Sequence, residues 1–161
     1  MVRCLRAVLP VVALVSFGCA SLEGLRALIQ PPRFRQDDER RSELRLVGTS
    51  GAAVRIWTKV SNPNGFGLTL GTLRGTLFLE GGRAATADFP LGLPLAARGE
   101  EVVPLDISVS FRDLPGLGQA LSRAIARQPV RYGLEGTIGV EAGGLGEQVF
   151  GPMQFLSGEL R

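Results

Sequence analysis

Hydrophobic and polar side chains alternate with a period of two along most of the chain after residue 43. The alternation recurs in segments separated mostly by Gly-rich turns, and these segments are 44–48, 53–60, 70–79, 83–91, 103–111, 130–141 and 147–156. Strand side chains point alternately to the two faces of a sheet, so each segment predicts a strand with one buried face. Gly81-Gly82 predicts a two-residue hairpin turn. The pattern therefore predicts about seven short antiparallel strands packed as two sheets.

A different period appears between the fifth and sixth of these segments. Its apolar positions are spaced by three and four residues, and they are Leu114, Leu117, Leu121 and Ile125. Asp113 and Pro115 suit the start of a helix, and Gln128-Pro129 ends it. We predict one amphipathic helix over about 114–128, whose apolar stripe packs on the core at an open end of the sandwich. A helix on a membrane surface is the alternative, because basic residues lie opposite the stripe.

The first residues have the composition of an export signal. Arg3 and Arg6 precede an apolar stretch over 7–17. That stretch is shorter than the roughly 20 apolar residues needed to span a bilayer core. It fits the hydrophobic region of a secretory signal. We therefore predict a signal peptide over 1–18.

Small residues surround Cys19, and Gly18-Cys19-Ala20 resembles the lipobox of bacterial lipoproteins. In those proteins cleavage precedes a cysteine that becomes lipidated, so the resemblance implies a lipid on Cys19. Ser16 and Phe17 depart from the usual pattern of a leucine-like residue followed by a small one. Cys19 has no disulfide partner in the predicted mature chain, and lipidation explains why a lone cysteine is kept. An ordinary signal peptide with a chance cysteine is the alternative.

After Cys19 the sequence predicts a lipidated N-terminus and tether over 19–43, followed by one domain over 44–161. Pro31-Pro32 stops a short apolar run of helical spacing, which lies against either the membrane or the domain. Residues 33–43 carry many charges of both signs, and such runs usually form solvated loops.

The turn after the second predicted strand reads Ser-Asn-Pro-Asn-Gly-Phe-Gly-Leu over 61–68. Pro63 cannot donate to a ladder and therefore ends the strand. The side chain of Asn62 is placed to bond backbone groups two residues on. Asn64-Gly65 tolerates the positive φ that a tight turn needs. We predict that Asn62, Pro63 and Asn64 form a structural corner.

This Asn-Pro-Asn element is followed by Leu-x-x-Leu-x-Gly-x-Leu-x-Leu over 70–79 and by Val-Pro-Leu-x-Ile-x-Val-x-Phe over 103–111. Together they resemble the bacterial members of the late-embryogenesis-abundant type 2 family, whose core is the water stress and hypersensitive response (WHy) domain. The resemblance covers roughly 32–156. It implies an all-β, immunoglobulin/fibronectin-III-like antiparallel sandwich without a catalytic centre, and a role in stress and desiccation tolerance.

Composition and charge narrow the class of protein. The chain has 161 residues, which suits one domain, and its 45% apolar content is enough for a packed core. Its formal charge is +3, but Arg3 and Arg6 lie in the predicted signal peptide, so 16 of the 18 basic residues remain against 15 acidic ones. This balance predicts no nucleic-acid partner.

The search for catalytic chemistry finds few candidates. Histidine is absent, which removes the commonest general base and metal ligand. The sequence contains no Gly-x-Ser-x-Gly elbow, Walker loop or dinucleotide fingerprint. The carboxylates considered for a hydrolytic pair are scattered, and they are Asp88, Asp106, Asp113 and Glu135. We expect no catalytic residues, no metal and no cofactor.

One surface is a candidate for binding. Trp57 is the only tryptophan, and the alternation places it on the face shared by Arg55 and Lys59. An outward tryptophan between cations is suited to stacking or cation–π contacts. The alternative is that the tether covers this face and Trp57 packs beneath it.

The two resemblances imply a non-enzymatic, lipid-anchored protein of the bacterial cell envelope that protects membranes or proteins under water stress. Because Ala20 does not specify inner-membrane retention in lipoproteins, the periplasmic side of the outer membrane is the favoured location. A monomer is favoured. The alternative is an envelope binding or assembly module for a lipid, a glycan or a protein, on the same sandwich.

Overall fold

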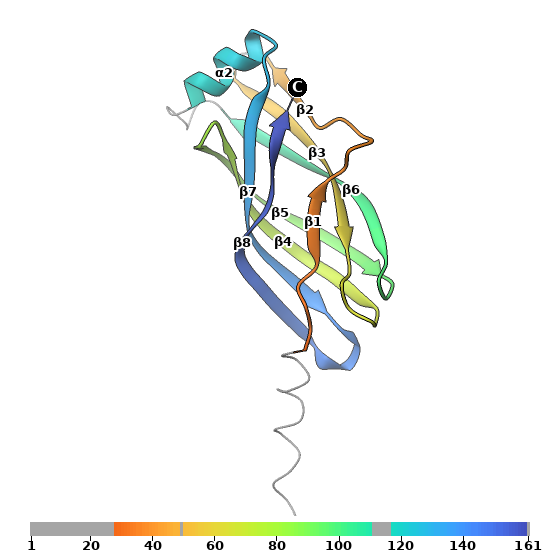
Figure 1. The fold of residues 1–161 in the computed structure, drawn as a ribbon. Helices are drawn as coiled ribbons and strands as arrows, with labels where there is room; N and C mark the ends of the chain where they lie inside the picture. Colours follow the sequence, from red (N-terminus) through yellow and green to blue (C-terminus); the bar gives the residue numbers. More distant parts are fainter. Residues whose placement is uncertain (1–27, 49, 111–116, 161) are drawn as a thin grey trace, which may run out of the picture.

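The computed structural model describes residues 28–48, 50–110 and 117–160, and in these residues the chain forms two antiparallel β-sheets and one α-helix (Figure 1). The strands and helix in chain order are β1 (Arg33–Gln36), β2 (Glu43–Val47), β3 (Gly51–Ser61), β4 (Leu68–Leu79), β5 (Gly82–Leu95), β6 (Glu100–Ser110), α2 (Gly118–Ile125), β7 (Val130–Glu141) and β8 (Glu147–Leu160). The predicted all-β sandwich, with one helix before the last two strands, is confirmed.

The first sheet is built around β3. One edge of β3 pairs with β6 along its whole length, and the other edge pairs with both β1 and β2. β1 pairs with residues 58–61 and β2 with residues 51–55, so these two short strands lie end to end and residues 37–42 form a loop between them. The second sheet has the order β5-β4-β7-β8. Its edge strand β8 lies beside β1, where the two sheets approach each other (Figure 1).

β1 lies in a segment for which the sequence predicts a solvated charged loop, and that prediction is wrong for these four residues. Phe34 packs edge to face on Phe155, with ring centroids 4.8 Å apart. The Tyr132 hydroxyl donates a hydrogen bond of 2.9 Å to Gln36 Oε1, and burial raises the pKa of Tyr132 to about 12. An alternation of four residues, two of them arginine, is too short to be recognised within so charged a segment.

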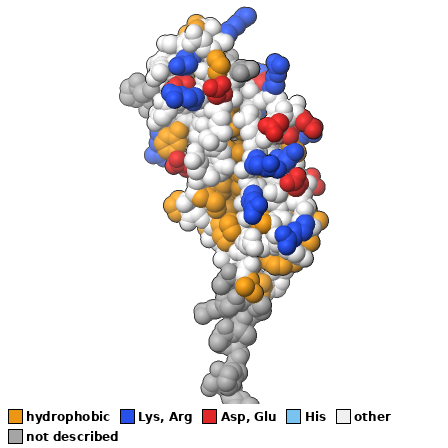
Figure 2. Space-filling model, in the orientation of Figure 1, with side chains coloured by type: hydrophobic (Ala, Val, Ile, Leu, Met, Phe, Trp, Pro, Cys, Tyr) orange, Lys and Arg blue, Asp and Glu red, His pale blue; other side chains and the backbone are white. Residues whose placement is uncertain are grey.

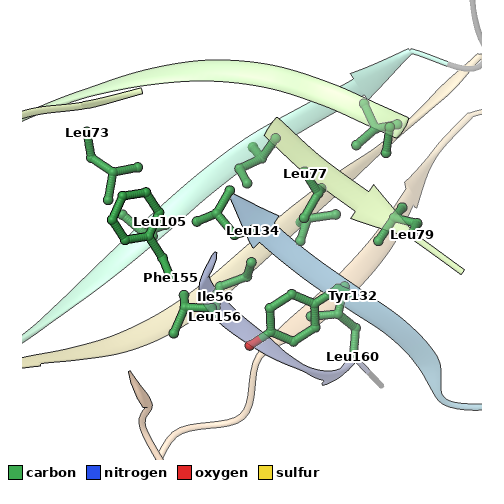
Figure 3. Packing of buried hydrophobic residues seen from close by; sticks show 14 of the residues in the cluster. Ile56, Leu73, Leu77, Leu79, Leu105, Tyr132, Leu134, Phe155, Leu156 and Leu160 are labelled. Carbon is green, nitrogen blue, oxygen red and sulfur yellow. The ribbon is translucent and has the colours of Figure 1, made fainter. Parts of the chain in front are cut away.

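The core lies between the inward faces of the two sheets (Figure 3). Both sheets contribute to its largest fully buried side chains, which include Ile56, Leu70, Leu73, Leu77, Leu79, Leu105, Leu134, Ile138 and Leu160. Each such side chain stabilises the fold by roughly 1.5–3 kcal/mol. Most of these positions are on the face that the alternation predicts to be buried. Leu70 lies before a register shift and is out of phase with Leu73, and Leu160 lies beyond the predicted strand over 147–156.

The hairpin between β4 and β5 turns at Glu80-Gly81, one residue before the predicted Gly81-Gly82. Leu79 pairs with Gly82, and φ is 47° at Glu80 and 82° at Gly81. A type I′ turn needs positive φ at both central residues. The sequence predicts glycine at both positions, whereas Gly82 already belongs to β5 and Glu80 occupies the first position of the turn.

The helix α2 is shorter than the predicted 114–128. Asp113, Leu114 and Pro115, at its predicted start, lie outside the described residues. The observed helix ends at Ile125, and Arg127 turns the chain with φ of 54°. Leu117 and Ala120 are buried against the core, whereas Ile125 is 67% exposed. The stripe is therefore predicted correctly at Leu117 but wrongly at Ile125, because the helix stops there instead of continuing over the core.

Candidate functional site

The Asn-Pro-Asn element forms a buried polar cluster at one end of the sandwich. Asn62 and Asn64 are both buried, and the Asn64 backbone N–H donates to Asn62 Oδ1 over 2.9 Å. This confirms the predicted bond to the residue two positions on. The Asn62 side-chain nitrogen also donates to the carbonyls of Phe66 and Ala96, at 2.8 and 2.9 Å. Asn62 therefore joins the β3–β4 turn to the β5–β6 turn.

Asn64 binds the chain that precedes β1. Its Oδ1 accepts a hydrogen bond of 2.9 Å from the Gln30 backbone N–H, and its Nδ2 donates one of 2.9 Å to the Gln30 carbonyl. The predicted positive φ at Asn64-Gly65 is wrong, since neither residue has it. The turn instead requires the side-chain amide of Asn64, which forms hydrogen bonds to the backbone of Gln30, 34 residues earlier in the chain. Nothing in the local sequence indicates that pairing.

Arg55, on the outward face of β3, is paired with a neighbouring strand. Its guanidinium donates to the two carboxylate oxygens of Asp106 at 2.6 and 3.0 Å, and the two residues are directly opposite each other on β3 and β6. The hydrogen bond from Arg55 lowers the pKa of Asp106. Both side chains are about half exposed, so the pair contributes little to stability.

Trp57 lies under the loop over 37–42. Its backbone N–H donates to Ser42 Oγ at 3.2 Å, and its carbonyl accepts from the Asp37 N–H at 2.9 Å. The Arg40 guanidinium lies 4.9 Å from the centre of its ring. Lys59 Nζ is 3.9 Å from Asp37 Oδ1. The arrangement supports the alternative in which a segment upstream of the predicted domain covers Trp57.

Ion pairs follow one another along this outer face of the first sheet, which we call the charged face. The pairs are Arg35–Glu100, Lys59–Asp37, Arg55–Asp106 and Arg45–Glu43. Both signs are interspersed along one side of the molecule in Figure 2. The charged face therefore presents paired and largely hydrated charges instead of a single-sign patch.

A groove adjoins the charged face between the loop over 37–42 and β8. It has a volume of about 620 Å³, and its lining includes Arg35, Gln36, Arg40, Arg41, Ser157 and Glu159. Polar and charged groups of both signs line it, so it is suited to a polar partner more than to an apolar ligand.

Glu80 is a buried, ion-paired carboxylate that is not predicted from the sequence. Its buried carboxylate accepts from the Arg131 backbone N–H at 2.9 Å and from the Arg131 guanidinium at 3.0 Å, and it lies 3.6 Å from Arg123 Nε. The hydrogen bond from the Arg131 backbone is the main cause that lowers the pKa of Glu80. Glu80 thus ties the β4–β5 hairpin to α2 and β7. Only its place before Gly81-Gly82 singles it out in the sequence.

The remaining candidates are dispersed or lie outside the described residues. Asp88 lies 3.9 Å from Arg74, and Asp106 is held by Arg55. Cys19 and Asp113 are not among the described residues.

Within 28–48, 50–110 and 117–160 no cluster of three or more acidic, cysteine or histidine side chains is suited to a metal ion. In the same part of the chain no helix is long and apolar enough to cross a membrane.

Comparison with known proteins gives both a family and a fold. A family model described as late embryogenesis abundant protein matches residues 58–152. The solution structure of AT1g01470 from Arabidopsis thaliana is 16% identical, with a TM-score of 0.58 over 76% of this chain and 78% of that one. The solution structure of At2g46140.1, named as a late embryogenesis abundant protein, is 18% identical, with a TM-score of 0.52 over 88% of this chain and 79% of that one. No curated protein sequence matches the chain.

Proposed function

The chain belongs to the type 2 family of late embryogenesis abundant proteins, and from that premise we propose that it is a non-enzymatic, lipid-anchored protein of the bacterial cell envelope. Its role is to protect neighbouring membranes and proteins during water loss. The anchor is a lipid on Cys19, and the favoured location is the periplasmic side of the outer membrane. The chain acts as a monomer.

The observation that carries the protective role is the charged face. Surfaces with both signs of charge interspersed and without apolar patches resist association with other surfaces. Because the cations Arg35, Arg45, Arg55 and Lys59 each have an acidic partner, the face has little net attraction for a polyanion or a polycation. A domain with such a face keeps membranes and proteins apart when the water between them is removed.

The N-terminal segment supports the anchored arrangement. Asn64 holds Gln30 by two hydrogen bonds of 2.9 Å. Ile29 and Pro32, on either side of Gln30, are buried. Residues 29–32 are therefore fixed at the end of the domain that carries the Asn-Pro-Asn element. A lipid on Cys19 tethers the domain by that end.

A drying assay tests the protective role. Lactate dehydrogenase and phosphatidylcholine vesicles loaded with a dye are dried and rehydrated with the purified chain or with an equal mass of serum albumin. We expect more enzyme activity and less dye leakage with the chain. Equal losses with the chain and with albumin would refute the proposal.

Two variants test whether the charged face carries the protection. The first neutralises two pairs without changing the net charge, through Glu43→Gln, Arg45→Gln, Arg55→Gln and Asp106→Asn. The matched control neutralises a pair on the second sheet, through Arg74→Gln and Asp88→Asn, whose charges are 3.9 Å apart. We expect the first variant to lose protection and the control to keep it. Equal protection by both variants contradicts the assigned role of the charged face.

The groove beside the charged face favours a second candidate function, an envelope binding or assembly module. Ser157 lines the groove on the β8 side and is exposed, so Ser157→Arg places a bulky side chain in it. A pull-down from detergent-solubilised envelope should capture a stoichiometric partner with the unmodified chain and lose it with Ser157→Arg. Capture that is unaffected by Ser157→Arg argues against binding in the groove.

A further inference from the structure

The end of the sandwich at which Asn64 binds Gln30 is formed by loops that are almost free of charge. These loops are residues 62–67 between β3 and β4, 96–99 between β5 and β6, and 142–146 between β7 and β8. Among their residues only Arg98 is charged, and the others are mainly glycine, alanine and asparagine. We call this surface the uncharged end.

Contacts between the loops hold the uncharged end together. The Arg98 N–H donates to the Asn64 carbonyl at 3.0 Å, and the Asn62 N–H donates to the Gly99 carbonyl at 2.9 Å. A shallow groove of about 510 Å³ joins all three loops, and its lining includes Gly67, Ala96 and Gly143. The three loops therefore form one continuous surface.

Two large apolar side chains are exposed at this end. Phe66, in the first loop, is 42% exposed, and Leu28 is 68% exposed. Leu28 belongs to the same end because Gln30, two residues further on, is bound to Asn64. Figure 2 shows hydrophobic side chains at the lower end of the described part of the chain.

We propose that the uncharged end rests on a lipid bilayer, with Phe66 and Leu28 entering its interfacial region. This inference depends on the proposed lipid at Cys19. Leu28 is the ninth residue after Cys19, so even a fully extended chain places Leu28 within about 30 Å of the anchor. The strand β3 alone, with 11 residues, adds roughly 36 Å towards the opposite end. The uncharged end is thus the part of the domain that the anchor brings nearest to the bilayer.

The chemistry of the uncharged end suits a lipid surface. Aromatic and aliphatic side chains gain free energy on entering the membrane interface, and nearby charges oppose that entry. The glycines and alanines of the loops let the backbone approach the headgroups closely. Glu101 and Glu141 lie at the rim of the groove and outnumber the single cation, Arg98, so the end attracts no anionic headgroups. The surface therefore fits a zwitterionic bilayer and gains little from anionic lipids.

Site-directed spin labelling of the full, processed chain in phosphatidylcholine vesicles tests this orientation. Nitroxide labels are attached at Phe66→Cys, at Ala97→Cys on a second loop of the uncharged end, and at Ile125→Cys on α2. Ile125 is the matched control, because it is an exposed apolar residue, 67% accessible, on an element outside the uncharged end. Accessibility to oxygen, which enters lipid, is compared with accessibility to a polar nickel chelate.

We expect the nickel-to-oxygen ratio to be severalfold lower at positions 66 and 97 than at position 125. Equal ratios at all three positions on chains that float with the vesicles overturn the inference and leave the lipid anchor standing. A chain that takes up a second label at Cys19 and does not float overturns the anchor, and the orientation with it. The number of labels per chain therefore separates the two failures.

Discussion

Asn64 uses its side-chain amide as a peptide group. Its oxygen accepts from the Gln30 N–H and its nitrogen donates to the Gln30 carbonyl. The Asn64 side chain thus makes the two hydrogen bonds that a backbone residue of a neighbouring strand would make. Asn62 satisfies the backbone groups of two turns in the same cluster. Buried polar groups without partners cost about 1–3 kcal/mol each, which explains why both positions need an amide side chain.

Replacing Asn64 by alanine leaves the Gln30 N–H and carbonyl without these partners. We expect Asn64→Ala to destabilise the domain by about 2–4 kcal/mol in urea unfolding. Hydrogen exchange of the Gln30 N–H should accelerate more than exchange in the centre of β3. Asn64→Asp keeps an acceptor for that N–H but loses the donor, so its free energy of unfolding should lie between those of Asn64→Ala and the unmodified chain. Unchanged exchange at Gln30 in Asn64→Ala contradicts the assigned pairing.

Glu80 makes the stability depend on pH. Its pKa is lowered from the ordinary 4.5 by the hydrogen bond from the Arg131 backbone. A carboxylate with a lowered pKa in the folded state stabilises the protein above the unfolded pKa, and this stabilisation is lost as pH falls towards the folded value. We expect Glu80→Gln to lower the melting temperature at neutral pH. The difference in melting temperature between this variant and the unmodified chain should become smaller below pH 4.5. Glu101→Gln, at an exposed position, serves as the control, and a difference that does not vary with pH counts against this role of Glu80.

Among the elements, those with a long and regular pattern are predictable from the sequence. β3, β4, β6 and β7 have 11 or 12 residues each, and their alternation places the buried side chains correctly. β1 has four residues in a charged segment, and it becomes a strand because Phe34 and Gln36 find partners on Phe155 and Tyr132. These partners are about a hundred residues away, so the local sequence does not contain them. The same holds for the pairing of Asn64 with Gln30.

Hydrophobic periodicity predicts only part of which residues of α2 face the core. Spacing of three and four residues predicts that both Leu117 and Ile125 face the core, but the chain turns at Arg127 and leaves Ile125 exposed. Periodicity identifies the apolar face of a helix, whereas the end of the helix depends on where the following strand must begin.

Substitutions at Leu117, the N-cap of α2, and at Ile125, its last residue, test this assignment. Leu117 is 3% exposed, and Leu117→Ala should destabilise the domain by about 2–5 kcal/mol through the cavity it leaves. Ile125→Ala should change the free energy of unfolding by less than about 0.5 kcal/mol, because the side chain is in solvent. Urea unfolding of both variants measures the contrast. Equal losses from the two substitutions rule out the observed orientation of α2.

As a whole, the molecule is a sandwich with distinct surfaces. One outer face carries paired charges, and one end combines uncharged loops with the site at which Asn64 binds Gln30. The sequence predicts the two sheets and singles out Arg55, Trp57 and Lys59 as outward residues. It does not predict their partners, because Asp37, Arg40 and Asp106 are brought to them by pairing between strands and by a loop.

The proposed function requires that this sandwich be held at a membrane by a lipid on Cys19, and intact mass spectrometry of the mature protein from its native envelope measures that lipid. We expect a chain that begins at Cys19 and carries the added mass of diacylglycerol and a further acyl group. A mature chain that begins at any other residue, or that carries an unmodified Cys19, would rule out the lipid anchor.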